Sequence, residues 1–358
     1  MMNLSKRYFS LLTSCLTSAC IFACSGCIAQ QEKNDFKIGL ALYDAHDTFI
    51  SELASHFHDH VKSSNGKVQL ESYDASGSQY TQNTQVQQLI DNGCDVLCVN
   101  PVDRTAPGKI IELARESNTP VIFFNREPVE EDLKQWDHIY YVGSSAQGSG
   151  TMQGEIAASY IQSHPNTDKN KDGVIQYVIL EGEPGHQDSI MRSEESVEAL
   201  EHAGIKLEKV DYAIANWSRQ QAQTKVEQIL DKPIEMILAN NDAMAAGAVS
   251  AYEKASIPRV DRPIIFGFDG TQEGLKLMEN EQIVGTVYNN SKKQADAMYQ
   301  LAEDLAKNDS LQDVRLENNR YIYIPYKKIS YDTLDQYLND DQTQDFTSSD
   351  ISIHPNRQ

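Results

Sequence analysis

The sequence is short of positive charge. It has 31 lysine and arginine residues against 52 aspartate and glutamate residues, which gives a formal net charge of -21 over 358 residues. Nucleic acids and anionic membrane faces are bound through basic surfaces, so this balance argues against both as partners. Hydrophobic residues still make up 40% of the chain, which is enough for a large folded core. This length exceeds one compact core, so we expect two domains in a monomer that works outside the cytoplasm.

Cysteine is also scarce beyond the first 30 residues, where only Cys94 and Cys98 remain. Both lie in the run GCDVLCVN, which is typical of a buried strand. Residues four positions apart in a strand are separated by about 13 Å, which is too far for a disulfide. We therefore predict two packed free thiols rather than a disulfide or a metal site.

The N-terminal segment has no apolar run long enough to span a membrane. Lys6 and Arg7 provide a positive start, the run YFSLLTSCLTSACIFAC follows, and the small, polar segment SGCIAQQEKN comes next. This order is typical of a signal peptide, and IFAC resembles a lipobox. We predict that residues 1–27 are a lipoprotein signal peptide and that Cys24 or Cys27 carries the lipid that anchors the protein to a membrane. An ordinary cleaved signal peptide is the alternative.

From residue 36 onward, short apolar segments alternate with segments that have apolar residues at helical spacing. FKIGLALY, KVQLESYDA, DVLCVNP and PVIFFNREP are predicted strands, and the helical segments between them include DTFISELASHFHDHVKSS and QNTQVQQLIDNG. Repeated strand–helix units favour a parallel sheet with helices on both faces.

A second strand–helix series of similar length follows the helix predicted for GTMQGEIAASYIQS. Its strands are VIQYVILEG, IKLEKVDYAI, IEMILAN, PIIFGFD and IVGTVYN, and the chain then returns through the helix SKKQADAMYQLAEDLAKN and one strand, NRYIYIPYKKIS. The predicted fold is therefore α/β, with two doubly wound parallel-sheet lobes. The helices of the second series are predicted over 188–203, 218–230, 242–254 and 271–279.

Polar side chains follow the carboxyl ends of these strands, which is where open α/β sheets bind ligands. Carboxylates accept hydrogen bonds from hydroxyl groups, Asn and Arg donate to their oxygens, and aromatic faces cover the apolar patches of a sugar ring. The set therefore suits an uncharged ligand rich in hydroxyls. Each residue alone is also a plausible helix cap, but seven strand ends share the pattern. The residues are Asp44, Asp47, Phe49, Asn125, Arg126, His186, Asp188, Arg192, Trp217, Asn241, Asp242, Asp269 and Asn289.

Several of these segments carry a resemblance to a known family. EGEPGHQDSIMR, LANNDAMAAGAV, VIFFNREP, GFD and GTVYNN resemble the bacterial periplasmic glucose/galactose-binding proteins, which are type I periplasmic binding proteins. The resemblance runs in order from Lys37 to Tyr337 and implies two lobes joined by three crossing segments. The implied organisation is an N-terminal lobe of 36–144 and 289–325, a C-terminal lobe of 145–288 and 326–340, and a polar tail of 341–358.

The resemblance also implies which residues contact a sugar in the cleft between the lobes. Phe49 and Trp217 would sandwich the pyranose ring, and Asp47 would accept a hydrogen bond from the C4 hydroxyl. The implied contacts are Asp47, Phe49 and Asn125 from the N-terminal lobe, Asn289 at a crossing, and His186, Asp188, Arg192, Trp217, Asn241 and Asp269 from the C-terminal lobe.

The function implied by the resemblance is capture of D-glucose or D-galactose for an ABC permease, with a chemoreceptor as a second partner in the family and no enzymatic activity. His46, Thr48 and Arg126 differ from the residues that the family usually has at the cleft mouth. The preference between glucose and galactose therefore stays open.

The segment DKNKDGVIQY is similar to an EF-hand calcium loop that lacks its last ligand. Oxygen-bearing side chains stand at positions 1, 3 and 5 from Asp168, and Gly173 occupies the turn position, but position 12 is Ile179 instead of glutamate. The resemblance implies that a distant strand supplies the missing carboxylate and that calcium binds here. An Asp- and Asn-rich turn without an ion is the alternative. The implied ligands are Asp168, Asn170, Asp172, the Val174 carbonyl, Gln176 and Glu235.

Other function classes fit the sequence less well. The segment GSGTMQG, with Gly148, Gly150 and Gly154, opens a helix like a dinucleotide-binding loop, but its spacing differs by one residue. A hydrolase is disfavoured because no G-x-S-x-G motif accompanies His186. A sugar-responsive transcription regulator would need a helix-turn-helix before the first strand, where the signal peptide lies. A receptor for ribose, xylose or a sugar-like signal is the open alternative.

Overall fold

The computed structural model of the chain describes residues 36–308, 311 and 315–338. The predicted signal peptide with Cys24 and Cys27, and the predicted tail of 341–358, lie outside the described residues. Within the described part of the chain, no helix is long and apolar enough to cross a membrane.

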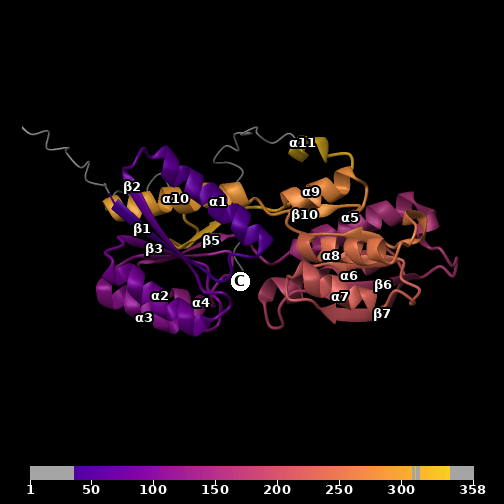
Figure 1. Cartoon of the computed structure of the whole chain (residues 1–358), viewed down its shortest axis with the longest axis horizontal. Helices are drawn as coiled ribbons and strands as arrows, with labels where there is room; N and C mark the ends of the chain where they lie inside the picture. Colours follow the sequence, from indigo (N-terminus) through magenta and orange to yellow (C-terminus); the bar gives the residue numbers. More distant parts are fainter. Residues whose placement is uncertain (1–35, 309–310, 312–314, 339–358) are drawn as a thin grey trace, which may run out of the picture.

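Two lobes lie side by side along the long axis of the molecule (Figure 1). The N-terminal lobe, called the N lobe below, is built on a six-stranded parallel sheet in the order β11-β5-β4-β3-β1-β2. Because strand–helix units repeat along the chain, neighbouring strands run in the same direction and end at one edge of the sheet. The strands are β1 (Phe36–Leu42), β2 (Val68–Asp74), β3 (Val96–Val99), β4 (Val121–Phe124), β5 (Ile139–Gly143) and β11 (Tyr321–Tyr323).

Helices cover both faces of the N-lobe sheet. One face packs against α1 (Thr48–Ser63) and α10 (Ser291–Lys307), and the other packs against α2 (Gln79–Asp91) and α3 (Gly108–Ser117). The short helix α4 (Glu130–Leu133) precedes β5. Helix α2 begins earlier than its apolar pattern predicts, because the Ser78 hydroxyl accepts a hydrogen bond from the Thr81 amide at 3.2 Å and caps the helix there.

The C-terminal lobe, called the C lobe below, repeats the architecture with a four-stranded parallel sheet in the order β7-β6-β8-β9. A short antiparallel pair, β10 and β12, continues this sheet through isolated bridges beside β9. The strands are β6 (Ile175–Glu181), β7 (Leu207–Ile214), β8 (Met236–Ala239), β9 (Ile264–Phe266), β10 (Thr286–Tyr288) and β12 (Lys327–Ile329).

Helices also cover both faces of the C-lobe sheet. The helices α5 (Ser149–Ser163) and α6 (Gln187–His202) pack on one face. The other face packs against α7 (Arg219–Glu227), α8 (Asp242–Lys254) and α9 (Gln272–Glu279). The remaining elements of the described C lobe are the 3₁₀ turns Pro165–Thr167 and Arg259–Asp261 and the short helix α11 (Asp335–Leu338).

The chain passes between the lobes three times, from β5 to α5, from β10 to α10, and from β11 to β12. The segment NRYIYIPYKKIS, predicted as a single strand, is divided by the third crossing. Its first part, β11, joins β5 in the N lobe, and its second part, β12, pairs with β10 in the C lobe. Pro325 lies between the two parts and has no amide to donate to a sheet. The predicted two-lobe α/β fold with three crossings is confirmed, whereas the single strand is corrected.

The glycines of GSGTMQG allow close helix packing. A Cβ atom on Gly150 would lie 2.6 Å from the Met191 carbonyl oxygen, so α5 and α6 approach at this point more closely than a side chain permits. The amides of Gly148 and Gly150 donate to the Glu195 carboxylate at 3.0 and 3.1 Å. A carboxylate of the protein therefore occupies the helix start where a dinucleotide would place its phosphates.

The prediction of two packed thiols is confirmed, because Cys94 and Cys98 are both free and buried within the described chain. Burial raises the pKa of the Cys94 thiol to about 11, so this thiol is protonated at neutral pH. Neither side chain is placed for redox or metal chemistry.

Candidate functional site

A cavity lies between the lobes, at the carboxyl ends of both parallel sheets. The space between its lining atoms amounts to about 340 Å³, counting the part that is open to solvent. All the contacts implied by the resemblance line the cavity except Asn289. Of the other polar residues predicted at strand ends, Arg126 lines the cavity, whereas Asp44 and Asp242 do not. The lining residues are Tyr43, Asp47, Phe49, Ile50, Asn125 and Arg126 from the N lobe, and His186, Asp188, Arg192, Trp217, Asn241 and Asp269 from the C lobe.

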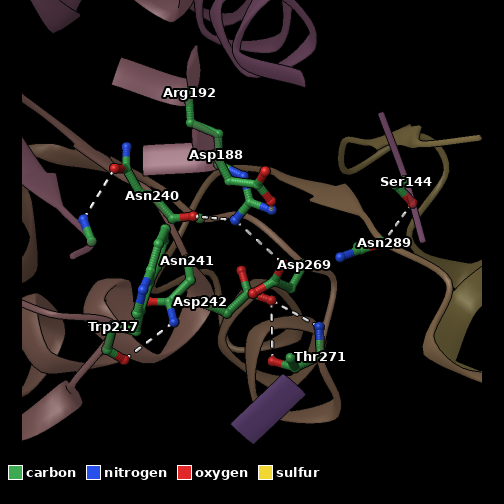
Figure 2. A network of polar contacts seen from close by, with 12 residues as sticks. Ser144, Asp188, Arg192, Trp217, Asn240, Asn241, Asp242, Asp269, Thr271 and Asn289 are labelled. Atoms are coloured by element: carbon green, nitrogen blue, oxygen red, sulfur yellow. Dashed lines mark hydrogen bonds and ion pairs between the residues drawn. The ribbon is translucent and has the colours of Figure 1, made fainter. Parts of the chain in front are cut away.

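Asn289 stands behind the cavity, at the crossing between β10 and α10. Its side-chain oxygen accepts a hydrogen bond from the Ser144 hydroxyl at 3.0 Å (Figure 2). The same oxygen accepts from the Gln294 side-chain amide at 2.6 Å. Its side chain also hydrogen-bonds Asp269, and its backbone amide donates to the Asp269 carbonyl at 2.9 Å. Asn289 therefore ties a lobe crossing to a carboxylate that lines the cavity.

Three lining residues also cap the helices that begin at the cavity. The Asp47 carboxylate accepts from the Ile50 amide at 2.9 Å, and the Asn241 side chain accepts from the Met244 amide at 2.8 Å. His186 accepts from the Asp188 amide through Nδ1 at 3.2 Å. Capping and cavity lining are therefore combined in the same side chains, because both require a polar group at the turn from strand to helix.

Several lining residues have left-handed backbone conformations. Asn125 has φ 58°, Trp217 has φ 61° and Asp269 has φ 104°. Such conformations cost on the order of 1–3 kcal/mol for residues other than glycine, and they cluster at functional sites. Trp217 is also accommodated by Gly182, since a Cβ atom there would lie 2.2 Å from the indole ring. The local backbone is thus adapted to direct these side chains into the cavity.

A buried guanidinium organises the C-lobe wall of the cavity. Arg192 donates through Nη1 to the Asn240 carbonyl at 2.7 Å and through Nη2 to the Asp188 carboxylate at 3.1 Å, and Nη1 lies 3.5 Å from Asp269 (Figure 2). Its Cζ lies 3.6 Å from the centroid of the Phe268 ring. Within the described chain, the buried Arg192 Nε has no hydrogen-bond partner.

Burial shifts the titration of the charged groups in this wall. It raises the pKa of Asp188 and raises that of Asp269 well above its usual value, although the Arg192 charge opposes both shifts. Burial also lowers the pKa of His186 well below its usual range, reinforced by Arg126 and Arg192, so the imidazole is neutral at physiological pH. Because His186 Nδ1 accepts from a backbone amide, the proton lies on Nε2, which can donate to a ligand.

The two aromatic residues predicted to contact the ligand belong to opposite walls of the cavity. Phe49 lies in the first turn of α1 in the N lobe, and Trp217 follows β7 in the C lobe. The Trp217 carbonyl accepts from the Asn241 amide at 3.2 Å, and its ring makes an edge contact with His186, with ring centroids 5.2 Å apart. The lining of the cavity therefore includes one aromatic ring from each lobe.

The contacts implied by the resemblance do not include three residues that line the cavity, Tyr43, Ile50 and Arg126. Arg126 is 4% exposed and its Cζ lies 3.5 Å from the Tyr43 ring centroid. The Tyr43 hydroxyl donates to Asp47 at 2.7 Å. The position of Arg126 after a strand places it in the predicted polar set, but the family resemblance implies no ligand contact for it. Tyr43 gave no signal, because its apolar ring made it look like the end of a strand.

The predicted calcium loop is joined to its distant carboxylate. Glu235 Oε1 accepts from the Lys169 amide at 2.6 Å and from the Asn170 amide at 3.3 Å, and Oε2 accepts from the Gln176 amide at 3.3 Å. The sharp turn is made at Gly173, which has φ 79°. The start of β8 and the loop before β6 therefore meet as the resemblance implied.

Side chains of the same loop converge on one carboxylate oxygen. Asp172 Oδ2 accepts from the Asn170 amide at 2.9 Å and from the Gln176 amide at 3.0 Å. Asp168 accepts from the Gly173 amide at 2.9 Å. The backbone amide of Val174 donates to Asp172 Oδ1 at 2.8 Å. The side-chain amides of Asn170 and Gln176 thus meet at Asp172, and Asp168 and Asp172 also accept from backbone amides of the turn.

Two carboxylates and a histidine also come together at the carboxyl ends of β1 and β2. Among the described residues, Asp44, His46 and Asp74 offer ligand atoms that all lie within 4.8 Å of one another. Asp74 accepts from the amides of Ala45 and Ser76 at 3.1 and 2.9 Å, and Asp44 accepts from the His46 amide at 2.8 Å. These hydrogen bonds within the loops account for the arrangement of the cluster.

Comparison with known proteins places this architecture in a family. The periplasmic binding protein domain matches residues 38–310. The chain is 35% identical over 310 residues to the D-galactose/methyl-galactoside binding periplasmic protein MglB of Haemophilus influenzae. The aligned region covers 85% of this chain and 92% of that protein. It is 29% identical over 301 residues to a putative rhizopine-binding protein of Rhizobium meliloti, with coverage of 83% and 90%.

The fold also matches solved structures. An ABC transporter solute binding protein of Bacillus halodurans with bound myo-inositol superposes with a TM-score of 0.72 at 25% identity, covering 86% of this chain and 99% of that one. The chain therefore belongs to the type I periplasmic binding protein family, whose members bind solutes and are not enzymes.

Proposed function

We propose that the protein captures D-galactose or D-glucose in the cavity between its lobes and delivers the sugar to an ABC importer. The observation that carries this proposal is that carboxylates, amides and two aromatic rings from both lobes line one cavity. The similarity to a galactose-binding protein over 85% of the chain supports the same class of ligand.

The C-lobe wall offers donors and acceptors suited to the hydroxyls of a monosaccharide. Arg192 Nε is a buried donor with no partner among the described residues, and a hydroxyl oxygen would satisfy it. Asp188, Asn241 and Asp269 would accept from the hydroxyls at C1 to C3, as the family resemblance implies. Neutral His186 would add a donor through Nε2.

The N-lobe wall would complete the contacts around the sugar. Asp47 would accept from the C4 hydroxyl, Asn125 would donate to a hydroxyl oxygen, and Phe49 would stack on the ring opposite Trp217. Each carboxylate has two oxygens with several acceptor directions, so Asp47 can accept from a sugar in addition to its bonds with Tyr43 and the helix start. This wall alone would leave most of the sugar exposed.

The mechanism that follows is capture by hinge closure. Three crossings connect the lobes, and a sugar that contacts both walls stabilises the closed arrangement relative to the open one. We place the lobe boundaries at 36–144 with 289–325, and at 145–288 with 326–340. The closed form would be recognised by the ABC permease, and a chemoreceptor is a further proposed partner. We also propose an extracytoplasmic location with a lipid anchor at Cys24 or Cys27.

Isothermal titration calorimetry with D-galactose, D-glucose, D-ribose, D-xylose and myo-inositol tests the ligand class. We expect one-to-one binding of galactose or glucose, and weaker or undetectable heat with the pentoses. Tighter binding of a pentose would replace the proposed hexose, and no heat with any of the five would contradict sugar capture.

A cyclitol is the second candidate ligand. Its support is the fold match to a protein that holds myo-inositol, together with a cavity whose carboxylates and amides suit hydroxyl groups. In the same titration, myo-inositol binding tighter than that of either hexose would favour this candidate.

We further propose that calcium binds the loop of the C lobe that begins at Asp168. Calcium favours six to eight oxygen ligands, and the residues present fit this preference. Two side-chain amides, from Asn170 and Gln176, now donate to Asp172, and rotating each amide would bring its oxygen to the same point. Glu235 already lies against the loop. The bound ion would stabilise the folded C lobe, with Asp168 and the Val174 carbonyl completing the shell.

Differential scanning calorimetry with and without a chelator tests the calcium proposal. Because the ion would bind only the folded state, its removal should lower the Tm by about 5 °C. A Glu235→Gln variant should have a lower Tm in calcium and should respond less to the chelator. The exposed Glu130→Gln variant serves as control and should respond like the parent protein. An unchanged Tm of the parent protein after chelation would contradict the proposal.

A further inference from the structure

An ion pair crosses the cleft beside the cavity. Arg126 follows β4 in the N lobe, and Glu183 follows β6 in the C lobe. The Arg126 Nη2 lies 3.1 Å from Glu183 Oε1, and Nη1 lies 3.0 Å from Oε2, so both carboxylate oxygens face the guanidinium. Two parallel contacts give such a pair a defined geometry as well as attraction.

The N-lobe side of this pair is firmly held. Arg126 Nη1 also donates to the Val102 carbonyl at 2.8 Å, and the guanidinium lies over the Tyr43 ring at 3.5 Å. The Arg126 side chain is 4% exposed, whereas that of Glu183 is 35% exposed. When the lobes separate, Arg126 therefore keeps its contacts within the N lobe, and the contact with Glu183 is the one that breaks.

The contacts continue from Arg126 to a residue of the proposed sugar site. Tyr43, beneath the guanidinium, donates its hydroxyl to Asp47 Oδ2 at 2.7 Å. Asp47 Oδ1 accepts from the Ile50 amide, which fixes the other half of the carboxylate. A continuous series thus runs from Glu183 in the C lobe to Asp47 in the N lobe through Arg126 and Tyr43.

We propose that Glu183 is a positioning residue for ligand retention. Its ion pair with Arg126 forms when the lobes close, stabilises the closed form and, through Tyr43, holds Asp47 in its position at the cavity. This inference rests on the proposed sugar capture. The inference predicts that the ion pair controls the dissociation rate of a bound sugar, because the lobes must separate and the pair must break before the sugar leaves. The association rate should not depend on the pair, because the sugar enters the open form, in which the pair is already broken.

A second contact across the cleft makes the role of charge testable. The Glu52 carboxylate on α1 accepts from the Gln272 amide at the start of α9 at 3.0 Å. Burial raises the pKa of Glu52, reinforced by Glu273, and the contact is made to a backbone amide rather than to a cation. Of these two contacts, the Arg126–Glu183 pair is the one that joins opposite charges, so charge attraction contributes to closure there.

Stopped-flow fluorescence with D-galactose, and with D-glucose as a second probe, tests the inference, since Trp217 lines the cavity and reports occupancy. Glu183→Gln should raise the dissociation rate about fivefold and leave the association rate within about twofold of the parent value. Glu130→Gln, which removes a surface carboxylate paired with Lys134 at 2.5 Å within one lobe, should leave both rates unchanged.

A double-mutant cycle separates positioning from a merely structural effect. Arg126→Gln should also raise the dissociation rate of the sugar. The double variant Arg126→Gln/Glu183→Gln should release the sugar less than about twofold faster than Arg126→Gln alone, because the ion pair is already broken in the single variant. An unchanged dissociation rate in Glu183→Gln, or full additivity in the double variant, would overturn the inference. If the parent protein gives no signal with either sugar, the proposed function fails, and the inference fails with it.

Discussion

The two walls of the cavity are built differently. In the C-lobe wall, the buried Arg192 guanidinium pairs with Asp188 at 3.1 Å and lies 3.5 Å from the buried Asp269, so the arrangement of these side chains does not depend on a ligand. In the N-lobe wall, Asp47 is held instead by a helix start and by the Tyr43 hydroxyl. The C-lobe wall is therefore preorganised around a buried guanidinium that faces two carboxylates, whereas in the N-lobe wall the neutral Tyr43 side chain links Arg126 to Asp47.

This difference assigns distinct roles to the two walls. Preorganised donors and acceptors lose little entropy on binding, so the C-lobe wall should supply most of the affinity. The N-lobe wall should act after closure, when its contacts and the Arg126–Glu183 pair retain the sugar. Variants of the C-lobe wall should therefore weaken binding more than variants of the N-lobe wall.

The largest expected effect comes from Asp188→Ala. The substitution leaves the buried Arg192 guanidinium without one partner and removes an acceptor for the sugar, so affinity should fall by about 100-fold or more. Calorimetry with D-galactose measures the loss. Asp211→Ala removes an exposed carboxylate paired with Lys232 at 2.5 Å in the same lobe and should bind like the parent. Parent-like binding by Asp188→Ala would refute the assignment of the C-lobe wall.

The next effect concerns the stability of the C lobe. Burial raises the pKa of Asp242 to about 7, although Thr286 and Thr271 donate hydrogen bonds to it. Between the unfolded pKa of about 3.9 and this value, the folded state holds a proton that the unfolded state has lost, so raising the pH destabilises the fold. From pH 4 to 7 this contribution should lower the unfolding free energy by a few kcal/mol.

Chemical denaturation at several pH values between 4 and 7.5 tests this prediction. Asp242→Asn cannot titrate, so its unfolding free energy should depend on pH less steeply than that of the parent protein over this range. Parallel curves for the two proteins would mean that Asp242 keeps an ordinary pKa in the fold.

The smallest effect should come from the N-lobe wall. Asp47→Asn keeps an acceptor for the start of α1, since Asn and Asp cap helices about equally well, but it removes the charge that strengthens a bond from a sugar hydroxyl. Affinity for D-galactose should fall about tenfold with little change in Tm. A loss larger than that of Asp188→Ala would reverse the proposed order of the two walls.

Much of the cavity was predictable from the sequence for a simple physical reason. Parallel strands end at one edge of a sheet, so polar residues that follow successive strands must come together, and Asp47, Asn125, Asp188 and Asp269 do so. The meeting of the calcium loop with Glu235 was implied by the family resemblance, since no local spacing links these segments.

Other features depend on contacts that no local pattern encodes. The pairing of Arg126 with Glu183 joins two lobes and becomes visible only when both are placed. The division of β11 from β12 depends on which neighbour each part pairs with, and alternation of apolar residues does not specify neighbours. The glycines of GSGTMQG resemble a dinucleotide-binding loop in the sequence. The structure shows that Gly150 instead allows α5 to approach α6 closely.

A crystal structure of the protein grown with saturating D-galactose would test the central claim most directly. The account predicts one sugar between Phe49 and Trp217, with hydroxyls within hydrogen-bond distance of Asp47 on one wall and of Asp188 and Arg192 on the other. A sugar bound elsewhere, or a cavity that stays free of sugar at saturation, would contradict it.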